Sequence, residues 1–351
     1  MVLTKDKLSE KAMGGTELMK HALVKHLGEE YLSDFQIFVS RIEESYDEDK
    51  IRIFWAHDLP NDPANRLLGK VQDNKGNEID GWKNFHKLVF NSNWQMQQYI
   101  AFFKIPWSHC IVLQNAIEPI PFNEDKWKPE TIDKKIKLIY TPTPHRGLII
   151  LASVFDKIAE DFDNVELDVY SSFKLYGWEE RDKEFSQVFE HLENHPKVNY
   201  YGSVPNEEVR KALQEAHILA YPSIWQETSC LCLMEAMSAG LVCVHSNYGA
   251  LPETAANWTH MYHMHEEPNQ HASIFYGVLR ATIEDIKSNP DFIKNRLLTQ
   301  KSYADVFYAW NNRKIQWKVM LDNLKESIKD RSLPKAPHPF AAGDTFEYST
   351  G

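Results

Sequence analysis

Short apolar runs that alternate with helical stretches are the feature that most constrains how this chain folds. Runs with the character of buried strands occur at residues 35–39, 51–56, 87–91, 110–113, 136–140, 166–170, 198–201, 218–221 and 241–245. Amphipathic segments lie between many of them, for example at 16–27, 148–161 and 207–216. Such alternation is typical of parallel sheets covered by helices on both faces, because parallel strands need a long crossover connection. The sequence therefore predicts an α/β protein.

Chain length and one proline-rich segment indicate two domains. The chain has 351 residues, which is enough for two separate hydrophobic cores. The segment from Glu118 to Asp133 contains three prolines and several charges and has no hydrophobic periodicity, so it is the best candidate for a boundary. Ligands of doubly wound sheets bind at the carboxyl ends of the strands. Two such domains facing each other would form a deep cleft.

Composition and charge exclude several classes of function. The net charge is −11, which disfavours a nucleic-acid partner. No run approaches the roughly 18 consecutive apolar residues of a membrane span, so we expect no integral membrane segment. Charges are spread through Met1 to Lys11, unlike in a secretory signal, and a cytoplasmic location is the expectation. The cysteines show neither C-x-x-C spacing nor a disulfide framework; they are Cys110, Cys230, Cys232 and Cys243.

The segment after the strand that ends at Tyr221 is predicted to bind an anion. Thr228 and Ser229 are predicted to cap or begin a helix that ends near Gly240. The amino terminus of a helix at the carboxyl end of a strand presents free backbone N–H groups. A diphosphate is the natural ligand for that arrangement.

Two glutamates flank the start of this predicted helix. Glu227 and Glu235 are eight residues apart, which corresponds to about 12 Å along a helix. That separation is too long for two carboxyl groups acting on one glycosidic bond, which lie about 5 to 9.5 Å apart. It suits two carboxylates that accept hydrogen bonds from hydroxyl groups on either side of a diphosphate. The alternative from spacing alone is that both are ordinary helix glutamates.

The sequence around these glutamates resembles the most characteristic block of the retaining family 4 glycosyltransferases, which have the GT-B fold. That block consists of Pro-Ser, a Glu, Glu-Ala-Met after seven intervening residues, a Gly, a strand and Gly-x-x-Pro-Glu. The matching positions are Pro222-Ser223, Glu227, Glu235-Ala-Met, Gly240 and Gly249-Ala-Leu-Pro252-Glu253. The resemblance implies two Rossmann-like doubly wound domains with a nucleotide-sugar site in the second.

The resemblance also implies roles for individual residues. Glu227 would lie near the hydroxyls of the transferred sugar, and Glu235 would hold the ribose. The loop with Gly14 and Gly15 resembles the family's amino-terminal Gly-Gly-x-Glu loop and would approach the donor. His57, at the end of a predicted strand, matches a histidine beside the transferred sugar. The family has a hydrophobic strand before the Gly-Gly loop, whereas residues 1–12 provide almost none, which implies truncation or a degenerate strand.

A single basic residue is expected to contact the donor phosphates. The family commonly has an Arg and a Lys-Gly about five residues apart at the start of the second domain. This chain has Arg146-Gly147, and Thr141 occupies the other position. The planar guanidinium of Arg146 matches phosphate oxygens and would stabilise the departing diphosphate. Thr228 and Ser229 stand where the family often has Gly-Phe and are expected to contribute to phosphate binding.

These matches predict the following organisation. Residues 1–133 would form the acceptor-side domain and residues 134–306 the donor-binding domain. Residues 307–331, whose tryptophans resemble those of the family's terminal helix, would cross back to the first domain. Residues 332–351 would be a loose tail, rich in Pro, Gly and small polar residues.

The predicted function is retaining, metal-independent transfer of a sugar from a nucleoside-diphosphate sugar, with no cofactor. The acceptor would be a sugar, a lipid or a protein glycan. Two Asp-x-Asp sequences, Asp47-Glu-Asp49 and Asp161-Phe-Asp163, do not end hydrophobic strands as a metal-binding motif requires. The four histidines between residues 260 and 271 are likewise not expected to bind a metal. Two alternatives remain: a GT-B nucleotide-sugar epimerase, or a sugar-nucleotide-binding protein with weak catalysis.

Overall fold

The computed structural model describes residues 13–42, 45–72 and 76–328, which form two compact units. The first unit contains described residues from 19–114 and 313–328, and the second contains 13–18 and 115–312. Residues 115–133, which the sequence assigned to the first domain, thus group with the second unit. The truncation or degenerate first strand expected at residues 1–12 and the loose tail expected at 332–351 lie outside the described residues.

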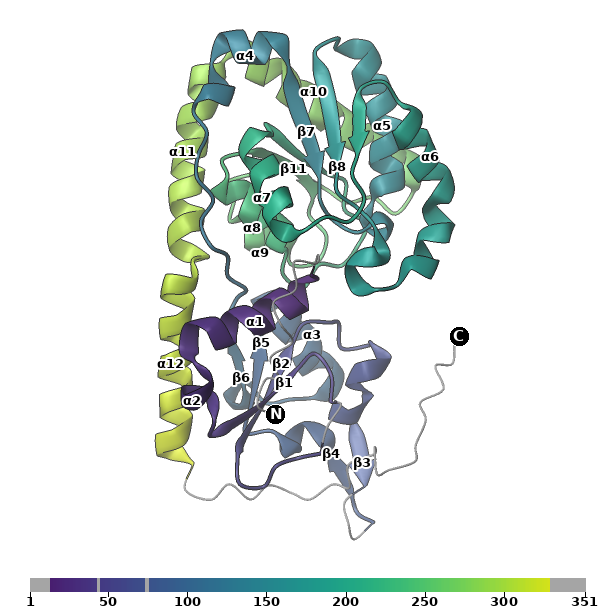
Figure 1. The fold of residues 1–351 in the computed structure, drawn as a ribbon. Coiled ribbons are helices and arrows are strands. Elements are labelled where there is room, and N and C mark those ends of the chain that lie inside the picture. The colour runs from purple at the N-terminus through teal and green to yellow at the C-terminus, as the bar shows by residue number, and fades with distance from the viewer. Residues whose placement is uncertain (1–12, 43–44, 73–75, 329–351) are drawn as a thin grey trace. The chain divides into compact units, whose positions relative to one another are not determined.

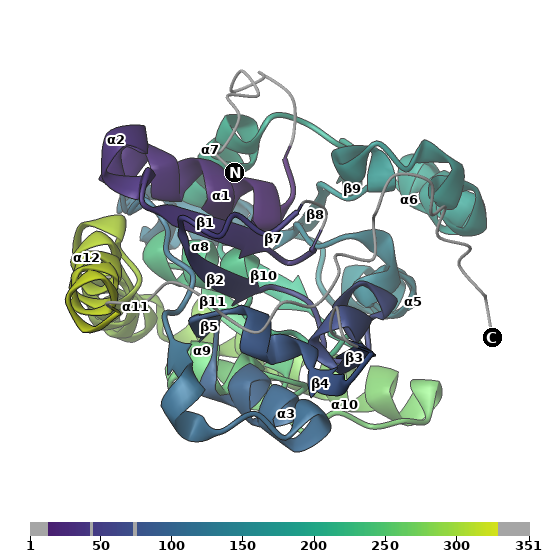
Figure 2. The ribbon, with the colours of Figure 1, turned by 90° about the horizontal axis from the view of Figure 1, so that it is seen from below.

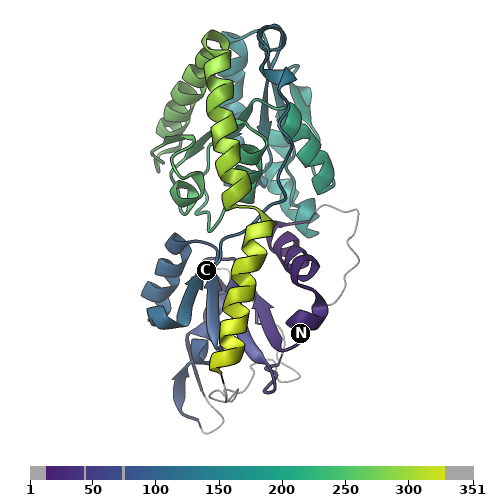
Figure 3. The same ribbon diagram turned by 90° about the vertical axis from the view of Figure 1, so that its left-hand side faces the viewer.

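The first unit is built on a parallel sheet with the strand order β1-β2-β5-β6. Its strands are β1 (Phe35–Val39), β2 (Ile51–Ala56), β5 (Lys87–Phe90) and β6 (Cys110–Val112), and β3 (Lys70–Gln72) and β4 (Glu78–Asp80) form a separate antiparallel pair. Its helices are α1 (Gly15–Leu27), which begins in the second unit, α2 (Glu29–Leu32) and α3 (Asn93–Phe103), with 3₁₀ turns η1 (Pro63–Leu68), η2 (Gly81–Asn84) and η3 (Trp107–His109). Helix α3 contacts β5 and β6, and α1 lies near β1 at the other end of the sheet (Figures 2 and 3).

The second unit contains a six-stranded parallel sheet with the order β12-β11-β10-β7-β8-β9 (Figure 1). The strands are β7 (Ile136–Tyr140), β8 (Val165–Val169), β9 (Val198–Tyr200), β10 (Ile218–Tyr221), β11 (Val242–Ser246) and β12 (His260–Tyr262). The helices are α4 (Pro129–Lys134), α5 (Leu148–Asp161), α6 (Ser186–Asn194), α7 (Asn206–Glu215), α8 (Leu231–Ser238), α9 (Leu251–Ala255), α10 (Pro268–Ser288) and α11 (Pro290–Phe307). Short 3₁₀ turns are η4 (Asp125–Trp127), η5 (Pro144–Arg146), η6 (Phe173–Tyr176) and η7 (Glu179–Phe185).

The order in which the chain adds strands to the second sheet reverses between β7 and β10, although all the strands are parallel. Strand β7 pairs with β8 on one side and with β10 on the other, so the chain fills one half of the sheet before returning to the centre. Helix α5, which follows β7, packs on α10, and helix α8, which follows β10, packs on α11. The connections therefore leave the carboxyl ends of these two strands in different directions, which opens the ligand-binding position of a doubly wound sheet.

The apolar runs identified in the sequence are strands, with ends that differ by at most one residue from those expected. Strand β10 is buried at every position, as a central strand covered on both faces must be. The short edge strand β12 was not expected as a strand. The helix predicted from residue 307 is α12 (Trp310–Ser327), and a break at Tyr308 and Ala309 separates it from α11 (Figure 3).

His217 joins β7 to the segment that leads into the second unit. Its Nδ1 accepts a hydrogen bond from the Lys137 backbone N–H (3.0 Å), and its Nε2 donates to the Lys126 carbonyl oxygen (2.9 Å). Because Nδ1 accepts a hydrogen bond from an N–H, it carries no proton, so this arrangement requires the neutral ring with its proton on Nε2. Burial lowers the pKa of His217 to about 4, from an ordinary value of 6.5.

We predict that His217 makes the protein less stable as the pH falls from about 6.5 to about 4. In that pH window the unfolded chain binds a proton that the folded ring excludes. Protonation therefore stabilises the unfolded state and lowers the free energy of unfolding by up to about 3 kcal/mol. His217→Gln should flatten the corresponding part of the curve of unfolding free energy against pH, measured by urea denaturation. His263→Gln, at an exposed position, is the control. An unchanged slope in His217→Gln would show that the assigned ring state is wrong.

Candidate functional site

Glu227 and Arg146 form a buried ion pair beside the switch between β7 and β10. Arg146 Nη1 lies 2.7 Å from Glu227 Oε1, and the Glu227 side chain is 4% exposed. The Tyr221 hydroxyl, at the end of β10, donates a hydrogen bond to the same oxygen (2.5 Å). Burial and the charge of Glu227 raise the pKa of Tyr221, so the phenol keeps its proton. Burial opposes the charge on Arg146, but Glu227, together with Tyr221, Tyr176 and Cys232, outweighs burial and holds the pKa of Arg146 above its ordinary value.

Two glycines allow the backbone segments that carry this pair to approach closely. Gly147 has φ 131°, and a Cβ there would overlap the carbonyl oxygen of Pro222. Gly249 has φ 66°, and a Cβ there would lie 2.5 Å from the carbonyl oxygen of Glu227. At the same place the Ala250 N–H donates to the Glu227 carbonyl oxygen (2.7 Å). Glycine is therefore required at both positions to fix Arg146 and Glu227 next to each other.

Thr228 and Ser229 lie before helix α8 and not in its first turn. The helix begins at Leu231, with Cys230 at the N-cap and no side-chain hydrogen bond to the cap. The prediction that Thr228 and Ser229 cap or begin the helix is therefore wrong, because the chain turns there through the bridge between Glu227 and Gly249. For the same reason the distance of about 12 Å expected for eight helical residues does not apply to Glu227 and Glu235.

Several buried polar atoms on the two turns that carry the ion pair have no protein partner. In the described part of the chain they include Thr143 Oγ1, His145 Nδ1, Arg146 Nε and Ser229 Oγ. The Arg146 side chain is one quarter exposed, so only some of its donors are used inside the protein. Unsatisfied buried polar groups are costly, so those on the turns beside the ion pair are candidates for contact with a polar ligand. Three of these atoms come from the turn after β7 and one from the turn before α8.

His145 has an aromatic environment that keeps it neutral. Its ring stacks on Phe173 with centroids 5.2 Å apart and meets the Trp225 ring edge-on at 4.6 Å. Burial lowers the pKa of His145 to about 4, and the charges of Arg146 and Arg181 act in the same direction. A neutral ring has a donor on one nitrogen and an acceptor on the other.

Glu235 has a different cationic partner, which the sequence did not reveal. Arg210, on α7, places Nη1 3.0 Å from Glu235 Oε1. The Glu235 side chain is 23% exposed, in contrast to the enclosed Glu227. Burial raises the pKa of Glu235, and Arg210 acts against that rise. The two glutamates of the block are thus held by two arginines from different elements.

The loop with Gly14 and Gly15 belongs to the second unit. The Asn206 side chain, at the start of α7, accepts a hydrogen bond from the Met13 N–H (3.0 Å) and donates to the Met13 carbonyl oxygen (3.3 Å). A Cβ on Gly14 would overlap the Tyr176 ring, and one on Gly15 would lie 3.1 Å from Leu231 at the start of α8. The structure therefore brings this loop to the amino terminus of α8.

His57 lies in the first unit, directly after β2. Its ring packs edge-on against Trp55, with centroids 4.6 Å apart. Burial lowers the pKa of His57 to about 3, so its imidazole is neutral at physiological pH. A neutral ring acts through hydrogen bonding and not through a positive charge. The predicted role of His57 at the donor sugar stays a prediction.

The histidines between residues 260 and 271 are engaged in separate contacts. His260 contacts the Thr282 hydroxyl (2.8 Å), and His271 contacts the Tyr262 hydroxyl (2.9 Å). Across residues 13–42, 45–72 and 76–328, no three His, Cys, Asp or Glu side chains converge in a way that could hold a metal ion. Over the same ranges, no helix has the length and apolar character needed to cross a membrane.

The site residues predicted from the sequence did not include Tyr221, Arg210 or His145. Tyr221 was read only as the end of a strand, and its hydroxyl reaches Glu227 because the chain turns back over β10. Arg210 lies three residues after Glu207, a spacing that by itself indicates a surface ion pair. His145 precedes Arg146 and could have been suspected from that position.

Comparison with known proteins supports a sugar-transferring family. The sequence profile of the family described as "Glycosyl transferases group 1" matches residues 121–296. One component of the human phosphatidylinositol N-acetylglucosaminyltransferase is 25% identical over 145 residues, which is 40% of this chain and 28% of the human protein. The match thus spans little more than a quarter of that relative.

Solved structures of glycosyltransferases share the fold. A glycosyltransferase from Rickettsia africae superposes with a TM-score of 0.56 at 14% identity, covering 88% of this chain and 82% of that one. Anabaena HepE, in complex with UDP, superposes with a TM-score of 0.58 at 16% identity, covering 78% and 72% of the two chains. These similarities establish the GT-B fold.

We predict that Gly249→Ala costs more stability than Gly202→Ala. The two glycines have nearly equal φ, 66° and 65°, but a Cβ on Gly202 has no neighbour closer than 3.8 Å, whereas one on Gly249 meets the Glu227 backbone. The left-handed conformation alone should cost about 1 kcal/mol in each variant. Gly249→Ala should lose at least about 1 kcal/mol more in urea denaturation, because the Glu227 segment must shift. Equal losses would mean that the close approach is not required.

Proposed function

The chain belongs to the glycosyl transferases of group 1, and from this membership we propose that it transfers a sugar from a nucleoside-diphosphate sugar. The single observation that carries the donor site is the buried Arg146–Glu227 ion pair beside the switch of the second sheet. Unpaired polar atoms of Thr143, His145 and Ser229 lie on the same turns. Switch points of this kind are where doubly wound sheets bind nucleotides.

The diphosphate is the best match for the unpaired atoms. Phosphate oxygens only accept hydrogen bonds, and Arg146 Nε and the hydroxyls of Thr143 and Ser229 can all donate. Arg146 is already oriented through Nη1 by Glu227, so its remaining donors are held in place before the ligand arrives. The uncapped start of α8 and the adjacent Gly14–Gly15 loop add backbone N–H groups. UDP bound to Anabaena HepE, which has the same fold, supports a ligand of this class.

The two glutamates are proposed to bind opposite ends of the donor. Glu227 would accept hydrogen bonds from the hydroxyls of the transferred sugar, and Glu235 would accept them from the ribose. Glu227 uses Oε1 for Arg146 and Tyr221, and no described residue is bonded to its Oε2. These roles follow the family resemblance of the block around both residues.

The reaction is proposed to retain the anomeric configuration. The bond from the sugar C1 to the diphosphate oxygen breaks, and an acceptor hydroxyl forms a new bond to C1 on the same face. The acceptor proton passes to the departing diphosphate oxygen. Arg146 would stabilise the charge on the leaving group, and neutral His57 and its backbone would support the positive charge on the sugar. The positive charge of Arg146 supplies what a metal ion supplies elsewhere, so we propose that no metal is needed.

The experiment begins with a ligand screen of the whole protein. UDP, GDP and ADP, and their glucose and N-acetylglucosamine derivatives where these exist, are tested by thermal shift, because a ligand that binds the folded state raises the melting temperature. Hydrolysis of the donor that binds is then followed by NMR, with and without EDTA. We expect slow hydrolysis that is insensitive to EDTA and releases a sugar with the anomeric configuration of the donor.

We predict that Arg146→Lys and Glu227→Gln each slow donor hydrolysis by about 100-fold. Lysine keeps the charge but not the planar set of donors, and glutamine keeps the shape but not the charge, so both should fold while losing stabilisation of the transition state. Arg280→Met, an exposed ion-paired position on α10, is the control and should keep wild-type activity. Epimer formed from donor alone would favour the epimerase, and donor binding without turnover would favour a binding protein.

A further inference from the structure

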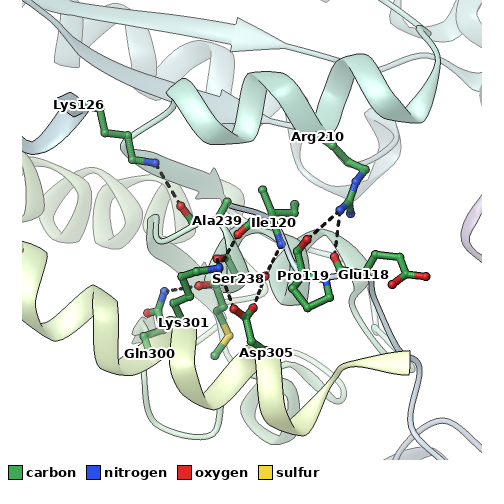
Figure 4. Close-up of polar contacts among 11 residues, drawn as sticks. Glu118, Pro119, Ile120, Lys126, Arg210, Ser238, Ala239, Gln300, Lys301 and Asp305 are labelled. Carbon is green, nitrogen blue, oxygen red and sulfur yellow. Dashed lines mark hydrogen bonds and ion pairs between the residues drawn. The ribbon is translucent and has the colours of Figure 1, made fainter. Parts of the chain in front are cut away.

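Arg210 connects Glu235 to the segment through which the chain enters the second unit. One guanidinium nitrogen, Nη1, lies 3.0 Å from Glu235 Oε1. The other, Nη2, donates to the carbonyl oxygens of Glu118 (3.0 Å) and Pro119 (3.3 Å), as Figure 4 shows. The Arg210 side chain is 18% exposed. A side chain held at both nitrogens in this way has little freedom to reorient.

The carbonyls that hold Arg210 are themselves fixed to helix α8, which carries Glu235. The Ile120 N–H donates to Ser238 Oγ (2.9 Å). Lys301, from α11, donates to the Ile120 carbonyl (2.5 Å) and to the Ser238 carbonyl (2.9 Å), as Figure 4 also shows. The backbone that holds Arg210 is thus attached to α8, the helix that carries Glu235. The Glu235 carboxylate is therefore positioned both by its own helix and by Arg210.

One oxygen of Glu235 is left for a ligand. Oε1 is occupied by Arg210, and no hydrogen bond to Oε2 occurs in the described part of the chain. The carboxylate is partly exposed, unlike that of Glu227. An ionised carboxylate accepts hydrogen bonds from the adjacent hydroxyls of a ribose, and it does so best when its plane is fixed beforehand.

We propose that Arg210 is a positioning residue for nucleoside recognition, which turns Glu235 so that its carboxylate selects a ribose over a 2′-deoxyribose. The inference rests on the proposed function, because it takes a nucleoside diphosphate as the ligand of the second unit. Arg210 does not touch the ligand. It acts through Glu235, and its loss should remove discrimination at the ribose and not the binding of the phosphates.

The charges around Glu235 come from several elements. Helix α7 supplies Arg210 and Glu207, and Cys232 lies on α8 itself. From α11, Lys301 and Asp305 contact the end of α8 at Ser238. Of the groups that influence Glu235, Arg210 is the one that favours its ionised form. Without Arg210 the pKa of Glu235 should rise further, so that the carboxylate is protonated at a higher pH.

The binding experiment uses the full chain and matched nucleotides. Calorimetry measures the dissociation constants of UDP, GDP and ADP and of their 2′-deoxy counterparts for the wild type, Arg210→Met, Arg210→Lys and Lys211→Met. Lys211 is the next residue of α7 and is paired with Glu208, so its variant removes one positive charge without touching Glu235. We expect the wild type and Lys211→Met to prefer the ribonucleotide by about tenfold.

Arg210→Met should bind the ribonucleotide about tenfold more weakly than the wild type and bind the 2′-deoxynucleotide within about twofold of it. Arg210→Lys keeps a charge but cannot contact both Glu235 and the backbone carbonyls, so its ribonucleotide affinity should lie between those of the wild type and Arg210→Met. In the wild type the preference for the ribonucleotide should disappear at low pH as Glu235 becomes protonated, whereas in Arg210→Met the ribonucleotide affinity should lack this pH dependence. A purely structural role would weaken both nucleotides equally and leave the pH profile in place.

The outcomes separate the two proposals. If the wild type binds no nucleoside diphosphate, the proposed function fails and this inference fails with it. If the wild type binds one and prefers the ribose, but Arg210→Met keeps that preference, the positioning role is overturned while the donor site stands. A wild type that binds both sugars equally also overturns it, because Glu235 then does not read the ribose.

Discussion

The ion pair between Arg146 and Glu227 is the interaction on which the organisation of the second unit depends. It joins the turn after β7 to the turn after β10, the two strands at which the direction of the sheet reverses. A buried ion pair contributes little net stability, because removing both charges from water is costly. Its main effect is positional. Gly147 lets the turn after β7 approach Pro222 in the turn after β10, and Gly249 lets the turn after β11 approach the Glu227 backbone.

Much of the fold could be predicted from the sequence, because parallel strands buried on both faces appear as continuous apolar runs. Glu227 and Glu235 could be identified from the block that surrounds them. The start of α8 at Leu231 could not be predicted, because Thr228 and Ser229 are ordinary capping residues and only the bridge between Glu227 and Gly249 diverts the chain. The separation of about 12 Å expected between Glu227 and Glu235 on a continuous helix therefore does not apply.

Arg210 and Tyr221 show why the partners of the glutamates were not visible. Each belongs to a segment whose own pattern explains it fully, an amphipathic helix for Arg210 and a buried strand for Tyr221. Their contacts with the glutamates depend on how the crossover connections bring α7 and β10 to α8 and its preceding turn. Local patterns specify secondary structure, but the pairing of charges between elements is decided by the topology of the sheet.

The two arginines make the two glutamates chemically different. Glu227 is enclosed and shares one oxygen between Arg146 and Tyr221, so its charge is balanced inside the protein. Glu235 is partly exposed, and burial raises its pKa against the influence of a single arginine. A ligand that brings hydroxyls to Glu235 adds hydrogen bonds to its ionised form and therefore lowers that pKa. Ligand binding at Glu235 and ionisation of Glu235 must then favour each other. The charge of Glu227, in contrast, is already neutralised by Arg146 without a ligand.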